Sequence, residues 1–226
     1  MRTRRVQAFG FSLLEVVLGL ALSALLILGL IKLMLSFEAS YRLQKAWLKM
    51  HQEAYFLSSY LLPRMARAGF SCEGSLNTPF VVQGYEAGHL PHFITSAQKV
   101  RGDVVVIGLC ARYEGRLQFK QFAYYVGETT RSNQQGQFIR VLYEKALDGN
   151  RIELEEGVQA LTMEYGLKSE TGALSYYPAS KITDWTQVVS LNLNFVLGSI
   201  EPVLINSKKQ FLLKPWKIYV YLRQSA

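Results

Sequence analysis

The sequence predicts an α+β fold in which a long N-terminal α-helix packs on a largely antiparallel β-sheet. Three observations lead to this prediction: an apolar run near the N-terminus, a helical spacing of apolar residues that continues to position 61, and alternation of apolar and polar residues after position 69. The chain of 226 residues suffices for one ordinary domain with an extended appendage. Half of the residues are hydrophobic and 19% are charged, so most of the chain is expected to fold.

The first expected element is the apolar stretch from Phe11 to Ile31, which carries a single charged residue. At about 1.5 Å of rise per residue, a helix of this length crosses the hydrocarbon core of a bilayer. Arg2, Arg4 and Arg5 precede the stretch and favour a cytoplasmic N-terminus with the remainder facing outward. Basic residues on the other side weigh against this orientation, namely Lys32, Arg42, Lys45 and Lys49. A secretory signal peptide is disfavoured because no small-residue cleavage site closes the run.

The same helix is expected to continue into an amphipathic segment that ends between Pro63 and Gly69. No proline or turn cluster interrupts the pattern before that point, and apolar residues recur at helical spacing. These residues are Leu43, Trp47, Met50, Ala54, Leu57 and Leu61. We interpret them as a core face, whereas Lys45, Lys49 and Gln52 lie away from the stripe.

Glu15 is the charged residue within the apolar stretch. A carboxylate in the hydrocarbon region costs about 3 kcal/mol even on the lenient insertion scale, so it requires a cationic partner. The arginines near the N-terminus lie at the other end of the entering segment, and Lys32 lies several helical turns away. We therefore expect the partner of Glu15 to come from another chain.

After Gly69 the period changes from 3.6 to 2, and clusters of Gly, Asn, Asp and Ser separate six expected strands. The strands are expected at Asp103 to Leu109, Gln118 to Val126, Phe138 to Glu144, Val158 to Tyr165, Val188 to Leu197 and Trp216 to Leu222. In the fifth strand, apolar residues from Val189 to Leu197 alternate with Ser190, Asn192 and Asn194, which predicts one buried face. The strands follow one another without helical stretches, so the sheet should be largely antiparallel and pack against the helix.

The run GFSLLEVVLGLALSALLILGL from Gly10 resembles the class III signal of type IV prepilins and type II secretion pseudopilins. A short basic leader, a glycine, a phenylalanine and a glutamate four residues later coincide in this segment. The resemblance implies cleavage by a prepilin peptidase between Gly10 and Phe11 and methylation of the new amine of Phe11. It also implies that Glu15 pairs with the N-terminal amine of a neighbouring subunit during assembly. Each charge then reduces the desolvation problem of the other.

The resemblance further implies a pilin-like organisation of the chain. Residues 1–10 would be the leader peptide that is removed, and residues 11–32 the transmembrane and assembly helix. Residues 33–69 would be the amphipathic soluble half of the helix, and residues 70–226 a periplasmic antiparallel β-sheet domain.

Longer segments resemble the PilW family of minor pilins. One is YRLQKAWLKMHQEAYFLSSYLLPRMARAGFSC, and another is LYEKALDGNRIELEEGVQALTMEYGLKSETGALSYYPASKITDWTQVVSLNLNFVL. The segment FLLKPWKIYVYLR resembles the last strand of the family, although the usual closing Arg-Asn reads Arg223-Gln224. The resemblance implies a minor pilin of a Gram-negative type IV pilus that primes assembly at or near the tip. Its partners would be other minor pilins, the major pilin and a tip adhesin, and it would reside in the inner membrane before assembly.

Cys72 and Cys110 are the only cysteines, too few for a disulfide scaffold and wrongly spaced for a zinc site. If the domain faces an oxidising periplasm, we expect them to form a disulfide. The closed loop of about forty residues would stabilise the fold by about 4 kcal/mol on the chain-entropy model. Two buried free cysteines are the alternative.

No catalytic, metal or cofactor site is predicted. His89 and His92 flank Pro91, which breaks a helix, and no third ligand lies nearby, so a surface loop is expected. Glu155 and Glu156 are adjacent and would point to opposite faces of a strand, so they cannot form a catalytic pair. The sequence contains no phosphate-binding loop, nucleophile elbow or His-Glu-x-x-His motif.

Two further features bear on function. Asp184 and Trp185 are interpreted as a turn residue followed by a buried aromatic residue.

The formal net charge of +8 falls to +5 without Arg2, Arg4 and Arg5, and the remaining basic residues are scattered. We therefore expect no direct binding of nucleic acid.

Two other functions remain open at this point. A minor pseudopilin of a type II secretion system shares the signal and the helix-plus-sheet design, although the Tyr-Gly and Asp-Trp order favours the pilus. A membrane-anchored periplasmic enzyme or ligand-binding module would need a convergent polar pocket, and the sequence shows no residues that would build one.

Overall fold

The computed structural model describes residues 12–69, 81–95, 99–113, 115–205 and 208–222. The chain divides into two compact units, Met1–Gln44 and Lys45–Ala226, and each is described by itself. Helix α1 (Leu13–Ala66) begins in the first unit and ends in the second. The predicted end of the helix between Pro63 and Gly69 is confirmed.

In the first unit, the helix from Val16 to Ile31 carries apolar or small side chains on all sides. None of the side chains from Leu13 to Phe37 is buried, and the large apolar ones are more than half exposed. A helix that is hydrophobic all round requires an apolar environment. Ser23 keeps its hydroxyl hydrogen-bonded within this segment, because its Oγ donates to the carbonyl of Gly19 at 2.8 Å.

The second unit contains the sheet. The strands are β1 (Val82–Tyr85), β2 (Arg101–Tyr113), β3 (Arg116–Ser132), β4 (Phe138–Ala146), β5 (Arg151–Glu156), β6 (Val158–Lys168), β7 (Leu174–Tyr177), β8 (Val188–Gly198), β9 (Val203–Ile205), β10 (Lys208–Gln210) and β11 (Leu213–Tyr221). Over the described ranges, β11-β8-β6-β2-β3-β4-β5 form one sheet in that order, with β1 on β2 and β7 on β6. Strands β9 and β10 pair only with each other.

The pairing is antiparallel except between β2 and β6, which meet in parallel register at Gly102 and Leu161. The predicted α+β class with a largely antiparallel sheet is therefore confirmed. All six expected strands are present, as β2, β3, β4, β6, β8 and β11. The short strands β1, β5, β7, β9 and β10 were not predicted.

The two halves of the sheet meet at a glycine. Gly102 has φ +88°, and a Cβ at this position would lie 2.3 Å from the carbonyl oxygen of Leu161. Only glycine permits this backbone conformation and approach without strain. The carboxylate of the next residue, Asp103, accepts a hydrogen bond from the Met163 N–H at 2.8 Å and so ties β2 to β6 a second time.

A second glycine redirects the chain from one half of the sheet to the other. Gly157 lies between β5 and β6 with φ +81°, and an added Cβ would lie 2.8 Å from the carbonyl oxygen of Gly198. The chain therefore leaves the β4 edge and continues at once as the neighbour of β8.

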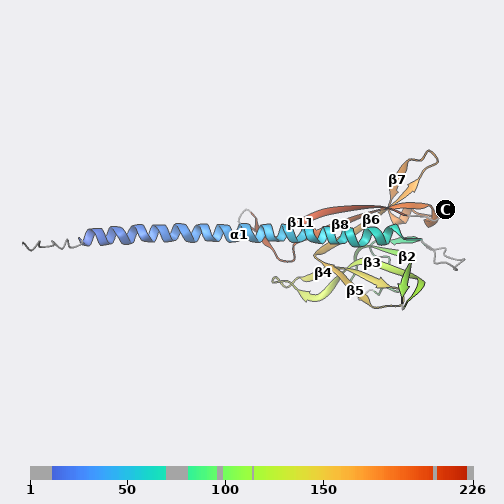
Figure 1. Cartoon of the computed structure of the whole chain (residues 1–226), viewed down its shortest axis with the longest axis horizontal. Helices are drawn as coiled ribbons and strands as arrows, with labels where there is room; N and C mark the ends of the chain where they lie inside the picture. Colours follow the sequence, from blue (N-terminus) through green and yellow to red (C-terminus); the bar gives the residue numbers. More distant parts are fainter. Residues whose placement is uncertain (1–11, 70–80, 96–98, 114, 206–207, 223–226) are drawn as a thin grey trace, which may run out of the picture. The chain divides into compact units, whose positions relative to one another are not determined.

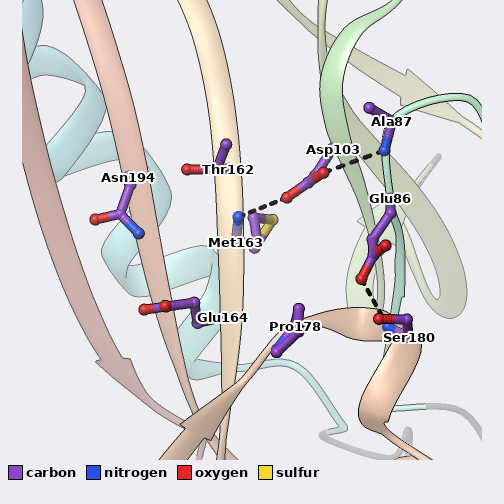
Figure 2. Close-up of a pocket in the computed structure, with 9 residues that line it drawn as sticks. All are labelled: Glu86, Ala87, Asp103, Thr162, Met163, Glu164, Pro178, Ser180 and Asn194. Atoms are coloured by element: carbon purple, nitrogen blue, oxygen red, sulfur yellow. Dashed lines mark hydrogen bonds between the residues drawn. The ribbon is translucent and has the colours of Figure 1, made fainter.

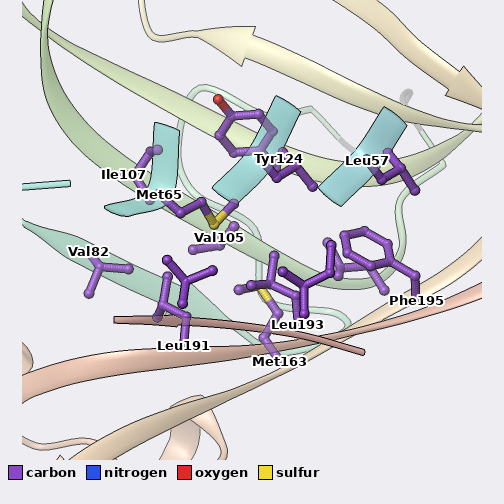
Figure 3. Close-up of a cluster of buried hydrophobic side chains, with 14 of the residues drawn as sticks. Leu57, Met65, Val82, Val105, Ile107, Tyr124, Met163, Leu191, Leu193 and Phe195 are labelled. Carbon is purple, nitrogen blue, oxygen red and sulfur yellow. The ribbon is translucent and has the colours of Figure 1, made fainter. Parts of the chain in front are cut away.

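The sheet curls round the part of α1 that belongs to the second unit (Figure 1). Apolar side chains from both halves of the sheet surround the helix there (Figure 3). From the predicted helical stripe, Met50, Ala54, Leu57 and Leu61 are buried, as expected. Trp47 is 37% exposed, so the prediction was wrong at this position. Its ring lies beside Lys214, whose Nζ is 5.5 Å from the ring centre.

Strand β8 differs from the expected one-sided strand. Leu191, Leu193, Phe195 and Leu197 lie in the core as predicted, but Ser190 and Asn192 on the other face are buried too. The Ser190 hydroxyl donates to the Tyr176 hydroxyl at 3.2 Å, and the Asn192 amide donates to Glu164 at 2.6 Å. Because β8 is flanked by β6 and β11, its neighbours cover polar side chains that the sequence pattern would leave exposed.

Candidate functional site

The start of α1 carries the predicted assembly residue. Ser12 caps the helix: its Oγ accepts a hydrogen bond from the Glu15 N–H at 3.3 Å, and its carbonyl accepts from Glu15 and Val16. Ser12-Leu13-Leu14-Glu15 has the spacing of a capping box, a signal that sequence reasoning missed. The Glu15 carboxylate is exposed in the first turn, near the positive end of the helix dipole. Among the described residues, no cation forms an ion pair with it.

The segment that follows Glu15 exposes a long run of large apolar side chains. By length and composition α1 is able to cross a membrane, and its most apolar part is not buried. The carboxylate of Glu15 is the only charge in this segment before Lys32. The segment therefore has the chemistry of a membrane helix with one unsatisfied acid near its start.

Three predicted site residues lie outside the described residues: Gly10, Phe11 and Cys72. The cleavage site and the disulfide therefore stay predictions. Cys110 is described, and it lies on β2 opposite Phe119 of β3, with a half-buried side chain.

In the second unit, a polar cluster fixes the last turns of α1 to the sheet. The Arg64 guanidinium contacts the Glu144 carboxylate at 2.5 Å and the Tyr124 hydroxyl at 3.3 Å, and the Tyr60 hydroxyl donates to Glu144 at 3.0 Å. Burial and the adjacent Glu144 raise the pKa of Tyr60 to about 12. Burial alone would lower the pKa of Arg64, but hydrogen bonding to Tyr124 and the charge of Glu144 raise it above its usual range. The cluster is a structural anchor with all its members paired to one another.

Glu53 is the most deeply buried acid of α1. Its side chain is 4% exposed. The Oε2 atom lies close to Gly157, at 3.4 Å from the position that a Cβ on this glycine would take. Lys49 contacts the other oxygen at 3.7 Å, and Oε2 has no hydrogen-bond partner. Burial raises the pKa of Glu53 to about 7, Lys49 lowers it, and Glu155 and Glu156 raise it further. The Lys-x-x-x-Glu spacing was visible in the sequence, but its burial was not.

The polar pocket shown in Figure 2 has a volume of about 530 Å³ and lies between β6, the β1–β2 connection and the short helix η2 (Ala179–Lys181). Each of its three carboxylates already accepts a hydrogen bond: Glu164 from the side-chain amide of Asn192 at 2.6 Å, and Asp103 and Glu86 from main-chain donors. Asp103 accepts from the N–H groups of Met163 and Ala87, and Glu86 accepts from Ser180 at 2.9 Å. Burial raises the pKa of Asp103, whereas the hydrogen bonds from Ser180 lower that of Glu86. These contacts are those of a structural junction.

The structure also describes the remaining positions singled out in the sequence. His89 and His92 are exposed outside the strands. No group of His, Cys, Asp and Glu in the described parts of the chain has the arrangement of a metal site. Asp184 caps the short helix η3 (Trp185–Gln187) by accepting from the Thr186 N–H at 3.0 Å, and Trp185 packs edge-on against Tyr165 at 4.8 Å. Trp185 is half-buried.

Residues 123–217, which span most of β3 to β11, match the family model described as PilW, Type IV Pilus-assembly protein W. This segment is therefore similar to the PilW family. No curated protein and no solved structure matches the chain. The PilW match indicates a role related to type IV pilus assembly and interaction with other pilus components, which suggests a structural rather than an enzymatic protein. Together with the apolar helix, it indicates anchoring in a membrane.

Proposed function

We propose that this chain is a minor pilin of a type IV pilus, processed by a prepilin peptidase and assembled through its N-terminal helix. The observation that carries the proposal is the exposed apolar stretch of α1 with a single acid in its first turn, in a chain whose sheet matches PilW. The match to PilW rather than to a secretion component supports the pilus over a type II pseudopilin.

Cleavage between Gly10 and Phe11 would place a new amine next to Ser12, the cap of α1. A cation at this position is disfavoured by the helix dipole, whereas the Glu15 carboxylate is favoured there. The amine therefore needs a carboxylate, and Glu15 in the apolar segment needs a cation. Pairing the amine of one subunit with Glu15 of its neighbour satisfies both. Before docking, the amine pairs with Glu15 of its own chain, and methylation of Phe11 keeps the positive charge.

The division of labour along the chain follows from this proposal. Residues 1–10 are the leader, 11–32 the transmembrane and assembly helix, 33–69 the amphipathic half, and 70–226 the periplasmic sheet domain. The N-terminus faces the cytoplasm before assembly, and the protein moves from the inner membrane into the pilus. Other minor pilins, the major pilin and a tip adhesin are its proposed partners, at or near the pilus tip.

Mass analysis of the mature N-terminus tests the proposal. Protein from sheared pili is expected to begin at methylated Phe11, without residues 1–10. Gly10→Val should block cleavage and filament entry, because glycine leaves the main chain accessible to the peptidase. Gly19→Ala is the matched control, since an added Cβ at Gly19 meets nothing within 4 Å.

Two results would contradict the proposal. Mature protein that retains residues 1–10 would exclude processing at this site. Correctly processed protein that is absent from sheared pili but associated with a secretion apparatus would replace the pilus with a type II system.

A further inference from the structure

Strand β11 forms one end of the curled sheet, and in the described part of the chain it pairs with β8 alone. The Leu222 N–H bonds to the Val189 carbonyl at 2.9 Å, which fixes the hydrogen-bonding register between the two segments. Because hydrogen-bonded pairs recur at every second residue, the even-numbered residues of β11 bond to β8. The main-chain groups of Lys217, Tyr219 and Tyr221 therefore face away from β8, at the free edge.

The other outer strands of the sheet are more strongly protected against strand addition than β11, which carries Pro215 and Lys217 on its edge but is long and mostly uncharged. In β5, four of six residues are charged, and β1 and β7 are only four residues long. These are the usual devices that keep an edge from pairing with another chain. Strand β11 has nine residues with two charges, and Leu213, Tyr219 and Tyr221 are 61%, 52% and 69% exposed.

The charge of the region indicates the kind of partner. From Pro202 to Ala226 the sequence contains no acidic residue and five basic ones: Lys208, Lys209, Lys214, Lys217 and Arg223. Lys217 is exposed on β11 itself, between the two outward tyrosines and Pro215. A second copy of this chain would bring two basic edges together, whereas a strand with acidic side chains would complement the edge.

Part of the flank of α1 next to β11 is also exposed in the part of the chain that the structure describes. Ser58 accepts a hydrogen bond from the Trp216 indole of β11 at 3.1 Å, and His51 contacts Lys214 at 3.2 Å. At about 100° per residue, Tyr55 and Leu62 project on this same flank, and they are 77% and 37% exposed. A strand added to β11 would continue the curl of the sheet over these side chains.

We propose that the free edge of β11 accepts an extended β-strand from a different protein chain, with acidic side chains opposite Lys217. The added strand satisfies the outward N–H and C=O groups of Lys217, Tyr219 and Tyr221 and packs on the exposed tyrosines. Nucleic acid fits the edge less well, because its phosphates accept hydrogen bonds but offer no donors to the alternating carbonyls. The inference goes beyond the pilus role and does not depend on the processing of the N-terminus.

Site-specific photo-crosslinking in intact cells tests the proposal on the full chain. A photoreactive phenylalanine replaces Tyr221, and Ile152 on the charged edge strand β5, which is 59% exposed, serves as the control position. Adducts are mapped by mass spectrometry to a segment of the partner. The expected result is an adduct at position 221, absent at 152, to an extended segment that contains Asp or Glu.

Two edge variants then separate strand pairing from side-chain contact. Tyr219→Pro removes an outward N–H without touching the bonds to β8, and Pro215 already occupies an equivalent position. Tyr219→Thr removes the same side chain but keeps the N–H. The proline variant should reduce the adduct about tenfold or more relative to the threonine variant. Lys217→Glu, which leaves the backbone intact, should also reduce it, and lower salt should increase it in the unchanged chain.

Several outcomes would overturn the proposal. One is an adduct to another copy of this chain, to nucleic acid or to lipid in place of a segment of a different protein. Another is an equal amount of adduct in the Tyr219→Pro and Tyr219→Thr variants. An unchanged adduct in Lys217→Glu would overturn the acidic partner. If the proline variant fails to fold, Lys217→Glu and the map of the partner segment still decide the question.

Discussion

The buried carboxylate of Glu53 should make the sheet unit less stable at alkaline pH. Glu53 is held against Gly157 by the turn between β5 and β6, with Lys49 on α1 and Glu155 and Glu156 on β5 as its charged neighbours. Burial is the largest cause that raises its pKa, from 4.5 to about 7. The folded state therefore binds the proton more tightly than the unfolded chain does. The contribution of Glu53 to the free energy of unfolding is therefore largest below pH 4.5 and is lost as the pH rises through 7.

The magnitude follows from the two pKa values. One pKa unit corresponds to about 1.4 kcal/mol, so fully ionising Glu53 in the folded state costs about 3 kcal/mol. Between pH 5 and pH 8, linkage gives a loss of about 2.5 kcal/mol from this group alone. Glu53→Gln keeps the shape of the side chain but cannot ionise. The variant and the original chain should therefore differ little at pH 5, and the variant should be more stable by about 2.5 kcal/mol at pH 8.

Urea unfolding of the full chain in detergent micelles measures this difference. Tryptophan fluorescence reports on the sheet unit, because Trp47, Trp185 and Trp216 all belong to it. Glu38→Gln is the matched control: Glu38 forms an exposed pair with Arg42 at the same i, i+4 spacing, and its loss should change stability by less than about 1 kcal/mol at either pH. If Glu53→Gln shifts the free energy of unfolding equally at pH 5 and pH 8, the argument from burial is wrong.

Three other perturbations test separate parts of the structure. Gly102→Ala should destabilise the sheet unit by about 2 kcal/mol or more in urea unfolding. Gly88→Ala is the control: Gly88 has φ +94° and open space around it, so this variant should show only the cost of backbone strain. Equal effects of the two substitutions would contradict the tight junction between Gly102 and Leu161. Glu15→Val should leave urea unfolding unchanged but reduce the protein in sheared pili, and incorporation at the original level would refute charge pairing. Cys72 and Cys110 should not react with a thiol-labelling reagent in the oxidised protein, and labelling without a reductant would exclude the disulfide. Cys110→Ser should lower the free energy of unfolding by about 4 kcal/mol.

The long elements were predictable because each has one face in the core. Helical spacing identified Met50, Ala54, Leu57 and Leu61, and alternation identified the central strands. Strand β5 was missed because charges dominate its sequence, and β7, β9 and β10 because three or four residues carry too little periodicity. Each of these strands is defined by hydrogen bonds to a strand adjacent in the sequence, β5 to β4, β7 to β6 and β9 to β10, and local apolar periodicity does not record such pairing.

The polar features were less accessible from the sequence. Glu15 stands out because an acid in an apolar run is anomalous, and its role stays a prediction. Glu53 is one of many acids in the chain, and only the turn at Gly157 buries it. Asp103 likewise reads as an ordinary strand residue, yet it joins the two halves of the sheet through Met163. Both depend on contacts between distant segments, which local periodicity does not encode.

The contact between β11 and α1 has a consequence for the order in which the chain folds. Trp216 and Ser58 are 158 positions apart, so a ribosome makes the helix long before the strand that covers its flank. Closing such a long loop is slow, and until it closes Ile218 and Val220 are missing from the core. A nascent chain thus carries an incompletely covered helix until the segment around Trp216 has been synthesised. During that interval the uncovered flank is open to a chaperone or to a wrong partner.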